Sequence, residues 1–213
     1  MSSFYDCRQV VDIADEPHHH LVIANEYVRA FAVEIPPRTR TLCHHHPHEY
    51  LLYVAKGAEI ISAARDEEPK RLNYVDGECE LSKAGLVHVV ENLGDGPFRN
   101  VVVELEPVAA ELKRGERPGA IAGDAKIQSI LEEGPGAVFS IELEPSAELE
   151  IAGPAVIAAP YEPVMIREIE EFDVPLDHFK KLMWVCAPRK VGVKNVAELP
   201  ATVLVFAVGI SSK

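Results

Sequence analysis

Residues 41–50 read TLCHHHPHEY, and this stretch places two imidazoles on one face of an extended chain. Alternate side chains of a β-strand point the same way, so His44 and His46 share a face, with Cα atoms about 7 Å apart from the strand rise. Two such imidazoles can converge on one metal ion that holds each ring nitrogen at about 2.0–2.1 Å. A third ligand must come from elsewhere, and His88 lies in an apolar, strand-like run at residues 87–92. We therefore predict a metal site of His44, His46 and His88.

The remaining histidines have no such partners in the sequence. The triplet at residues 18–20 sits in a polar segment with no matching distant ligand, and we interpret it as a solvated tract. His178 is a lone histidine near a short amphipathic stretch, and we expect it at the surface.

Short apolar runs, each ended by glycine, proline or charged residues, dominate the first half of the chain, at residues 28–35, 50–55, 58–64, 87–92 and 98–105. This spacing is typical of an antiparallel sandwich or barrel, so we predict an all-β fold. Two short helices are expected at residues 125–132 and 175–181. Residues 111–124 become polar and glycine-rich, which favours a linker there.

The second half of the chain echoes the first. The pattern FxVEIxP at residues 31–37 returns as FxIELxP at residues 139–145, an offset of 108, and Asn92 with the apolar run 101–103 returns as Asn195 with 204–206, an offset of 103. The echoes predict a duplicated unit of about 100 residues, with domains at residues 1–112 and 113–213. The alternative is that any two β-rich halves show such echoes.

The offsets also predict what the second unit has lost. The four site positions His44, His46, Tyr50 and His88 map to Ala152, Pro154, Ala158 and Val191. Because no imidazole or carboxylate remains there, we expect a second barrel without metal ligands.

Two motifs together resemble the cupin superfamily. The stretch 44–57 is similar to the first cupin motif, in which HxH is followed by an acidic ligand and a later glycine. Residues 77–92 are similar to the second motif, in which a glycine is followed by Pro-x-Gly, a histidine and an asparagine; Lys83 stands where proline is usual. The resemblance implies two double-stranded β-helix (jelly-roll) barrels with a few short helices, an RmlC-like bicupin whose C-terminal unit is degenerate.

One position departs from the cupin pattern. The acidic ligand of the family falls at Tyr50, whereas Glu49 comes one residue early. Inward parity on the following strand favours Tyr50 as a pocket residue and sends Glu49 outward. A site of three histidines is then expected, although a shift at Pro47 would let His48 or Glu49 reach the ion.

Composition restricts the partners. The 21 basic and 34 acidic side chains give a formal charge of −13, which argues against nucleic-acid binding. No apolar run approaches 18 residues and no signal peptide is visible, so we expect a cytoplasmic protein without a membrane segment. The cysteines are scattered and contain no CxxC, and we expect reduced thiols at all four positions, Cys7, Cys43, Cys79 and Cys186.

The predicted metal site leaves the activity open. By strand parity, Tyr50, Leu52 and Val90 are expected in the pocket wall. Four arginines are candidates for attracting an anionic substrate, with solvated surface positions as the alternative: Arg29, Arg38, Arg40 and Arg99.

Two main functions fit the predicted site, and a third is a site that binds metal only incidentally. The first is a metal-dependent oxygenase, isomerase or lyase that acts on a small oxygenated molecule with iron, zinc, manganese, nickel or cobalt. The second is a small-molecule-binding or regulatory cupin with a structural or vestigial metal. The resemblance also implies a homodimer.

Overall fold

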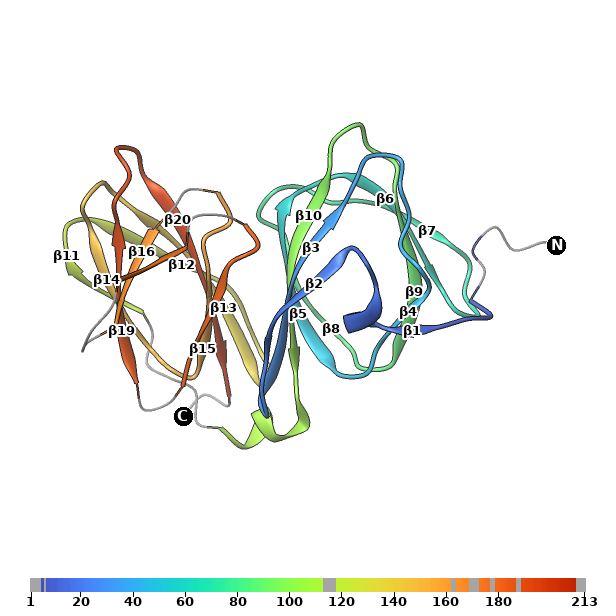
Figure 1. Cartoon of the computed structure of the whole chain (residues 1–213), viewed down its shortest axis with the longest axis horizontal. Helices are drawn as coiled ribbons and strands as arrows, with labels where there is room; N and C mark the ends of the chain where they lie inside the picture. Colours follow the sequence, from blue (N-terminus) through green and yellow to red (C-terminus); the bar gives the residue numbers. More distant parts are fainter. Residues whose placement is uncertain are drawn as a thin grey trace. The chain divides into compact units, whose positions relative to one another are not determined.

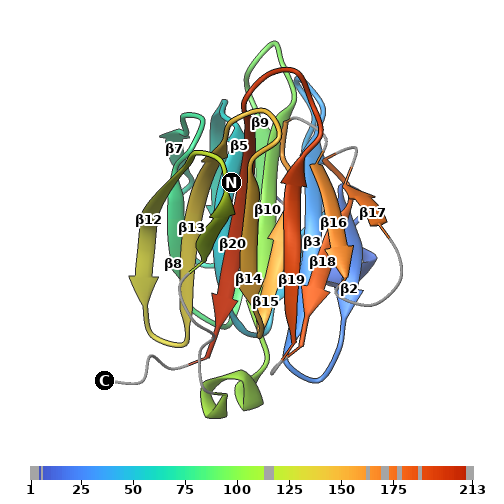
Figure 2. The ribbon, with the colours of Figure 1, turned by 90° about the vertical axis from the view of Figure 1, so that its left-hand side faces the viewer.

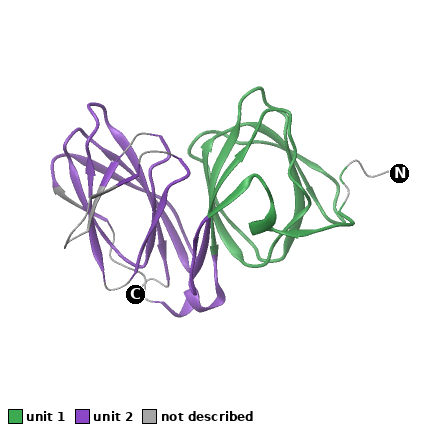
Figure 3. Ribbon diagram, in the orientation of Figure 1, with its two compact units in different colours: residues 1–21, 31–104 green, residues 22–30, 105–213 purple. Residues whose placement is uncertain are grey.

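A computed structural model describes residue 5 and residues 7–112, 118–161, 164–168, 173–176, 179–186 and 189–209. Strands dominate throughout, so the all-β prediction is confirmed (Figure 1). The chain forms two compact units, residues 1–21 with 31–104 and residues 22–30 with 105–213 (Figure 3). The domain boundary at residues 112/113 stays a prediction.

The first barrel, β1–β10, consists of two five-stranded sheets. One sheet has the order β1 (Val11–Asp12), β4 (His44–His46), β9 (Leu86–Asn92), β6 (Glu59–Ala64) and β7 (Lys70–Asn73). The other has the order β2 (His19–Ala24), β3 (Val28–Ile35), β10 (Phe98–Leu105), β5 (Glu49–Lys56) and β8 (Cys79–Ser82). Apolar side chains from both sheets, among them Phe31, Val54 and Ile60, form the core between them.

The second barrel, β11–β20, repeats this arrangement. One sheet has the order β11 (Gly119–Ala122), β14 (Glu148–Ala152), β19 (Lys190–Asn195), β16 (Val164–Glu168) and β17 (Asp173–Leu176). The other has the order β12 (Ala125–Glu133), β13 (Gly136–Leu143), β20 (Ala201–Val208), β15 (Ala155–Ala158) and β18 (Leu182–Val185) (Figure 2). Each strand thus occupies the place held in the first barrel by the strand ten labels earlier, as a duplication predicts.

A buried asparagine holds the same turn in both barrels. Asn92 Nδ2 donates to the carbonyl oxygens of Ile35 (3.0 Å) and Gly96 (2.9 Å), while its Oδ1 accepts from Gly94 N (2.8 Å). In the second barrel Asn195 Nδ2 donates to the carbonyl oxygens of Leu143 and Leu199, both at 2.9 Å, and Oδ1 accepts from Ala197 N. The asparagine of the second motif therefore closes a turn in each barrel.

Both predicted helices are wrong. Residues 125–133 form strand β12, which pairs with β13 along its length, and Pro175 lies in strand β17, paired with β16; residues 177–178, with His178, lie outside the described residues. Within the described ranges, the helical segments are two 3-10 turns, η1 (Ile13–Asp15) and η2 (Pro107–Glu111). Of the predicted linker, 113–117 lies outside the described residues, and 119–122 form β11.

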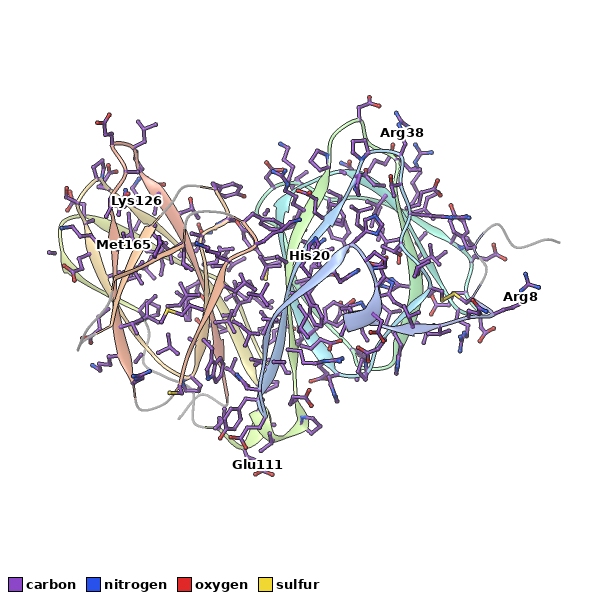
Figure 4. The ribbon with its side chains drawn as sticks, in the orientation of Figure 1. Arg8, His20, Arg38, Glu111, Lys126 and Met165 are labelled. Atoms are coloured by element: carbon purple, nitrogen blue, oxygen red, sulfur yellow. A yellow bond between two sulfur atoms is a disulfide. The ribbon has the colours of Figure 1, made fainter. Side chains whose placement is uncertain are left out.

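The expectation of four reduced thiols is also wrong. Cys7 and Cys43 form a disulfide, whereas Cys79 and Cys186 are free (Figure 4). Parallel pairing of β1 with β4 sets Val11 opposite His44, and Val11 N donates to the Cys43 carbonyl at 3.0 Å. The amino-terminal segment is therefore tied to the strand that carries His44. Within the described residues, no helix is long and apolar enough to cross a membrane.

Candidate metal centre

The three predicted ligands lie together inside the first barrel. His44 on β4 pairs directly with His88 on β9 in the antiparallel ladder, and their ring centroids are 4.6 Å apart. His46 lies two residues along β4 on the same face, 5.1 Å from His44 and 5.3 Å from His88 between ring centroids. All three residues are buried. Strand alternation and the β4–β9 register therefore bring together the side chains that the HxH spacing selected.

A fourth histidine joins them. His19 begins β2, its residue is 7% exposed, and its ring centroid lies 4.6 Å from that of His44 and 6.2 Å from that of His46. Ligand atoms of His19, His44 and His46 all lie within 4.8 Å of one another, as a shared metal ion requires, and the predicted ligand His88 is not in this group. The interpretation of residues 18–20 as a solvated tract is therefore wrong for His19, while His20 is exposed.

Glu16 positions His19. The 3-10 turn η1, capped by Asp12 Oδ1 on Ala14 N, directs the next residue, Glu16, into the barrel. Its carboxylate accepts from Nδ1 of His19 at 2.6 Å and contacts Nδ1 of His18 at 3.1 Å. Burial alone would raise the pKa of Glu16, but the hydrogen bonds from His19 and His18 outweigh burial and lower the pKa to about 2. Because the carboxylate of Glu16 occupies Nδ1, Nε2 of His19 is the nitrogen left for a metal.

The other imidazoles are also oriented by their neighbours. His44 Nδ1 donates to the Leu42 carbonyl at 3.0 Å, and its buried Nε2 has no hydrogen-bond partner among the described residues. His88 Nδ1 lies 3.2 Å from the Ser62 hydroxyl. His46 Nδ1 lies 3.3 Å from Oε1 of the fully buried Glu104 on β10. A buried imidazole nitrogen without a hydrogen-bond partner fits a metal ligand, because the metal would satisfy its lone pair.

Burial favours the neutral form of His44, His46 and His88. Burial, followed by the nearby His19, lowers the pKa of His44 to about 4. Burial and neighbouring imidazoles also lower the pKa values of His46 and His88 well below the usual value. Neutral imidazoles keep the lone pairs that a divalent metal needs, so the donor set fits a metal such as zinc or iron.

Tyr50 occupies the place of the missing acidic ligand. Its ring stacks on His46, with centroids 4.2 Å apart, and burial raises the pKa of its phenol to about 12. Glu49 is exposed on β5, as strand parity predicts, and His48 is half-buried. Neither is among the described residues whose ligand atoms converge.

A cavity of about 310 Å³ adjoins the histidines. The three predicted wall residues Tyr50, Leu52 and Val90 all line it, together with His19, His46 and His88. None of the four candidate arginines does. Arg38 pairs with Asp95 at an exposed loop, and Arg99 pairs with Glu34 (Figure 4). The arginines therefore agree with the alternative interpretation, in which they are not part of the pocket.

The glycines of the second motif have a backbone role. Gly77 and Gly85 adopt φ angles of +91° and +86°, in the left-handed region that other residues rarely enter. Gly77 lies just before β8, and Gly85 lies just before β9 and donates its N–H to the His46 carbonyl at 2.8 Å. The motif therefore shapes the turn that delivers His88 to the site.

The second barrel has an apolar interior at the matching positions. Ile151 pairs with Val191 in the β14–β19 ladder, where the first barrel pairs His44 with His88. Both side chains are buried in the core of the second barrel. Among its described residues, no histidine, cysteine or carboxylate cluster is placed to hold a metal. In the register with Val191, Ile151 rather than Ala152 lies at the position of His44.

Solved structures with similar folds cover most of the chain. A cupin 2 conserved barrel domain protein from Leptotrichia buccalis is 8% identical, with a TM-score of 0.57 over 92% of this chain and 89% of that one. The chain has the cupin fold. A salicylate 1,2-dioxygenase from Pseudaminobacter salicylatoxidans is 13% identical, with a TM-score of 0.61 over 88% of this chain and 75% of that one.

A third similar structure is a vicilin from Solanum melongena with anionic ligands in structurally similar pockets. It is 12% identical, with a TM-score of 0.63 over 85% of this chain and 74% of that one. No protein-family model and no curated protein matches the sequence. At these identities, the similarity shows the fold alone.

Proposed function

We propose that the first barrel holds one divalent metal ion and acts as a metal-dependent enzyme on a small oxygenated molecule. His44, His46 and His88 are the proposed ligands, with His19 as the fourth. The observation that carries the proposal is the convergence of ligand atoms from three buried histidines, His19, His44 and His46. Nε2 of His44 is buried and has no hydrogen-bond partner among the described residues. Such a metal would polarise an oxygen of a ligand in the adjoining cavity.

The chain's own residues support an oxygenase, isomerase or lyase chemistry at this site. Apolar side chains such as Leu52 and Val90 line part of the cavity, and the phenol of Tyr50 stays protonated beside His46. It can therefore donate a proton in a hydrogen bond to a ligand oxygen. The dioxygenase with a similar fold adds a precedent for oxygen chemistry in paired barrels, at the level of the fold only.

Metal content tests the proposal directly. Elemental analysis of protein purified without a histidine tag should find about one metal ion per chain, and the double variant His44→Ala/His88→Ala should contain none. His20→Ala is the matched control, because His20 comes from the same triplet but is exposed, and it should keep the full content. Equal metal loss in His20→Ala, or no metal in the wild type, would contradict the proposal.

A binding or regulatory cupin is the second candidate. Tyr50 in place of an acidic ligand favours it, because a site of histidines alone lacks the anionic ligand of a 2-His-1-carboxylate triad. A metal-loaded protein that retains a small molecule without converting it, under oxygen and without it, would support this candidate. Purified wild type that loses its metal without a change in melting temperature or ligand binding would indicate an incidental site.

Partners and location follow from the sequence. The charge of −13 disfavours nucleic acid, and a homodimer is implied by the cupin resemblance. A cytoplasmic location remains a proposal, and the Cys7–Cys43 disulfide weighs against it because disulfides are rare in reducing compartments.

A further inference from the structure

The lining of the first barrel's cavity holds a buried amide oxygen outside the histidine cluster that no described residue satisfies. Asn100, on β10, lines the cavity and is 3% exposed, and its Oδ1 has no hydrogen-bond partner among the described residues. A buried amide oxygen without a donor lowers stability, so such groups usually meet a ligand or an ordered water. Asn100 therefore marks a place where a hydrogen-bond donor is missing.

The neighbouring polar groups are already paired with one another. The Tyr74 hydroxyl donates to Glu80 Oε1 at 3.1 Å, and the Ser82 hydroxyl donates to the same oxygen at 3.3 Å. The rest of the wall is largely apolar, with side chains from both sheets such as Ile35, Leu72 and Phe98. A ligand thus meets apolar side chains from both sheets and, away from the histidines, an unsatisfied acceptor at Asn100.

Within the described lining, the one lysine or arginine is already paired with a carboxylate, so it is not available to an anionic ligand. Apart from histidine, Lys70 is the one basic residue of the described lining, and it lies at the rim with its side chain 67% exposed. Its ammonium already pairs with Glu67 at 2.7 Å. Glu67, Glu68 and Glu80 add negative charge to the same wall. A buried carboxylate or phosphate would therefore lose its hydration without gaining a partner from the wall.

A bound divalent metal ion would not make the cavity favourable for an anionic ligand. Glu16 stands behind His19, and Glu104 stands 3.3 Å from Nδ1 of His46, both with fully buried side chains. Together these two carboxylates balance the charge of one divalent cation bound by neutral imidazoles. An anionic ligand would then bring an uncompensated charge into the barrel.

We propose that this cavity binds a small uncharged molecule with an apolar body and a hydroxyl group that donates its hydrogen to Asn100 Oδ1. The inference rests on the proposed function and deepens it, since it names the ligand class of the same site. A volume of about 310 Å³ is at the small end for ligand pockets, which suits a molecule built around a single ring.

Three probes of nearly equal size test the ligand class: phenol, fluorobenzene and benzoate. Dissociation constants are measured by ligand-observed NMR on the zinc-loaded and the metal-free protein. We expect phenol to bind about tenfold more tightly than fluorobenzene, the factor for one buried hydrogen bond, and more tightly than benzoate. The preference for phenol should remain in the metal-free protein, because Asn100 is not a proposed metal ligand.

The variant Asn100→Leu isolates the role of the amide. We expect the tenfold preference for phenol over fluorobenzene to disappear, while Asn73→Leu, at an exposed position of β7 outside the cavity, should retain it. Leucine has a similar shape and removes the unsatisfied oxygen, so the melting temperature of Asn100→Leu should not fall. If that variant fails to fold, Asn100→Ala replaces it, with the same expected loss of preference.

Two results would overturn the inference. Benzoate that binds as tightly as phenol would contradict an uncharged ligand, and a phenol preference that survives in the Asn100 variant would contradict the role of Asn100. Both are independent of metal content. A protein without metal that still prefers phenol through Asn100 would refute the metal proposal and leave the ligand class supported.

Discussion

At the scale of single residues, the histidine cluster depends on the groups behind it. Glu16 contacts His18, His19 and the backbone N–H of Leu42, at 3.2 Å for the last, and so joins the start of β2 to the segment that leads into β4. Groups that hold a ligand imidazole in one orientation commonly change metal affinity by about 10–100-fold when they are removed. Glu16 is therefore a positioning residue for His19.

We predict that Glu16→Gln lowers zinc affinity by about tenfold or more. The amide keeps the size of the side chain but loses the negative charge that fixes the His19 tautomer. Competition with a chromogenic chelator measures the affinity. Glu34→Gln, which removes a carboxylate paired with Arg99 outside the cavity, is the control. Equal affinity in Glu16→Gln and wild type would show that His19 needs no such support.

The low pKa values of the buried histidines predict an acid-sensitive metal-free protein. The pKa of His44 is about 4 in the folded state, because of burial and then His19, against 6.5 for the free side chain. Between these pH values the unfolded chain takes up a proton that folded His44 does not. The free energy of unfolding should therefore fall as the pH is lowered from 6.5 to 4, by about 3 kcal/mol from this residue.

Urea denaturation of the metal-free protein at several pH values measures that slope. His46 and His88 act in the same direction. In His44→Ala the pH dependence between 6.5 and 4 should become shallower. A stability that is constant over this range would show that His44 titrates normally in the folded protein.

The sequence predicts those site residues whose partners can be found by spacing. His44 and His46 share a strand face, and His88 follows from the second motif. His19 lies in a triplet whose neighbours His18 and His20 look the same in sequence, and its burial depends on η1 and Glu16. The sequence signal that could have singled out His19 is Glu16, three residues earlier, because a nearby carboxylate can orient an imidazole. Glu104 and Asn100 lie in an apolar strand, where inward parity would have drawn attention to two buried polar side chains.

At the scale of elements, the asparagine turns are the clearest shared feature of the two barrels. Asn92 and Asn195 are fully buried, and each satisfies backbone groups of a turn and of the strand that precedes the HxH region or its counterpart. Without the side chain, these buried carbonyls and N–H groups have no donor or acceptor.

We predict that Asn92→Ala and Asn195→Ala each lower the free energy of unfolding by about 2–4 kcal/mol. Chemical denaturation measures the loss, with Asn73→Ala at an exposed position of β7 as the control. Metal content should remain near wild type in Asn195→Ala, because that turn belongs to the barrel without histidines. A negligible loss in either variant would mean that water replaces the amide.

The sequence predicts the fold class better than it predicts whether a given segment is a helix or a strand. Residues 125–133 contain alanine, lysine, glutamine, leucine and glutamate, which favour helices. The segment lies at the edge of its sheet and pairs with β13 over nearly its whole length. This tertiary pairing overrides the local helix preference. The Cys7–Cys43 pair was equally hidden, because the parallel β1–β4 contact joins segments 36 residues apart in the chain.

At the scale of the whole molecule, the two barrels differ in what they bury. The first encloses four histidines, Glu16, Glu104 and Asn100, whereas the described core of the second is a cluster of alanine, valine, leucine, isoleucine and phenylalanine with a partly buried methionine against it. Polar groups inside a barrel cost stability unless each is satisfied. Metal binding should therefore stabilise one barrel selectively.

We predict that zinc slows amide hydrogen exchange in β4 and β9 by at least tenfold and leaves β14 and β19 unchanged. A ligand at one hundred times its dissociation constant contributes about 2.7 kcal/mol to the state that binds it. Mass spectrometry of peptides from both barrels measures the exchange rates. Equal protection of both barrels would show that they unfold as one unit. Protection of β14 and β19 alone would place the metal in the wrong barrel.

The asparagine turns have a consequence for how a duplicated chain changes with time. Where the first barrel pairs His44 with His88, the second pairs Ile151 with Val191, and the strand ladder is kept. Metal ligands that are no longer used can therefore be replaced without loss of the fold. Replacement of Asn92 or Asn195 leaves buried backbone groups without hydrogen-bond partners, and this cost applies to a barrel with or without a metal site. Barrels of this kind that have lost their histidines should therefore still be recognisable by the turn that the buried asparagine closes.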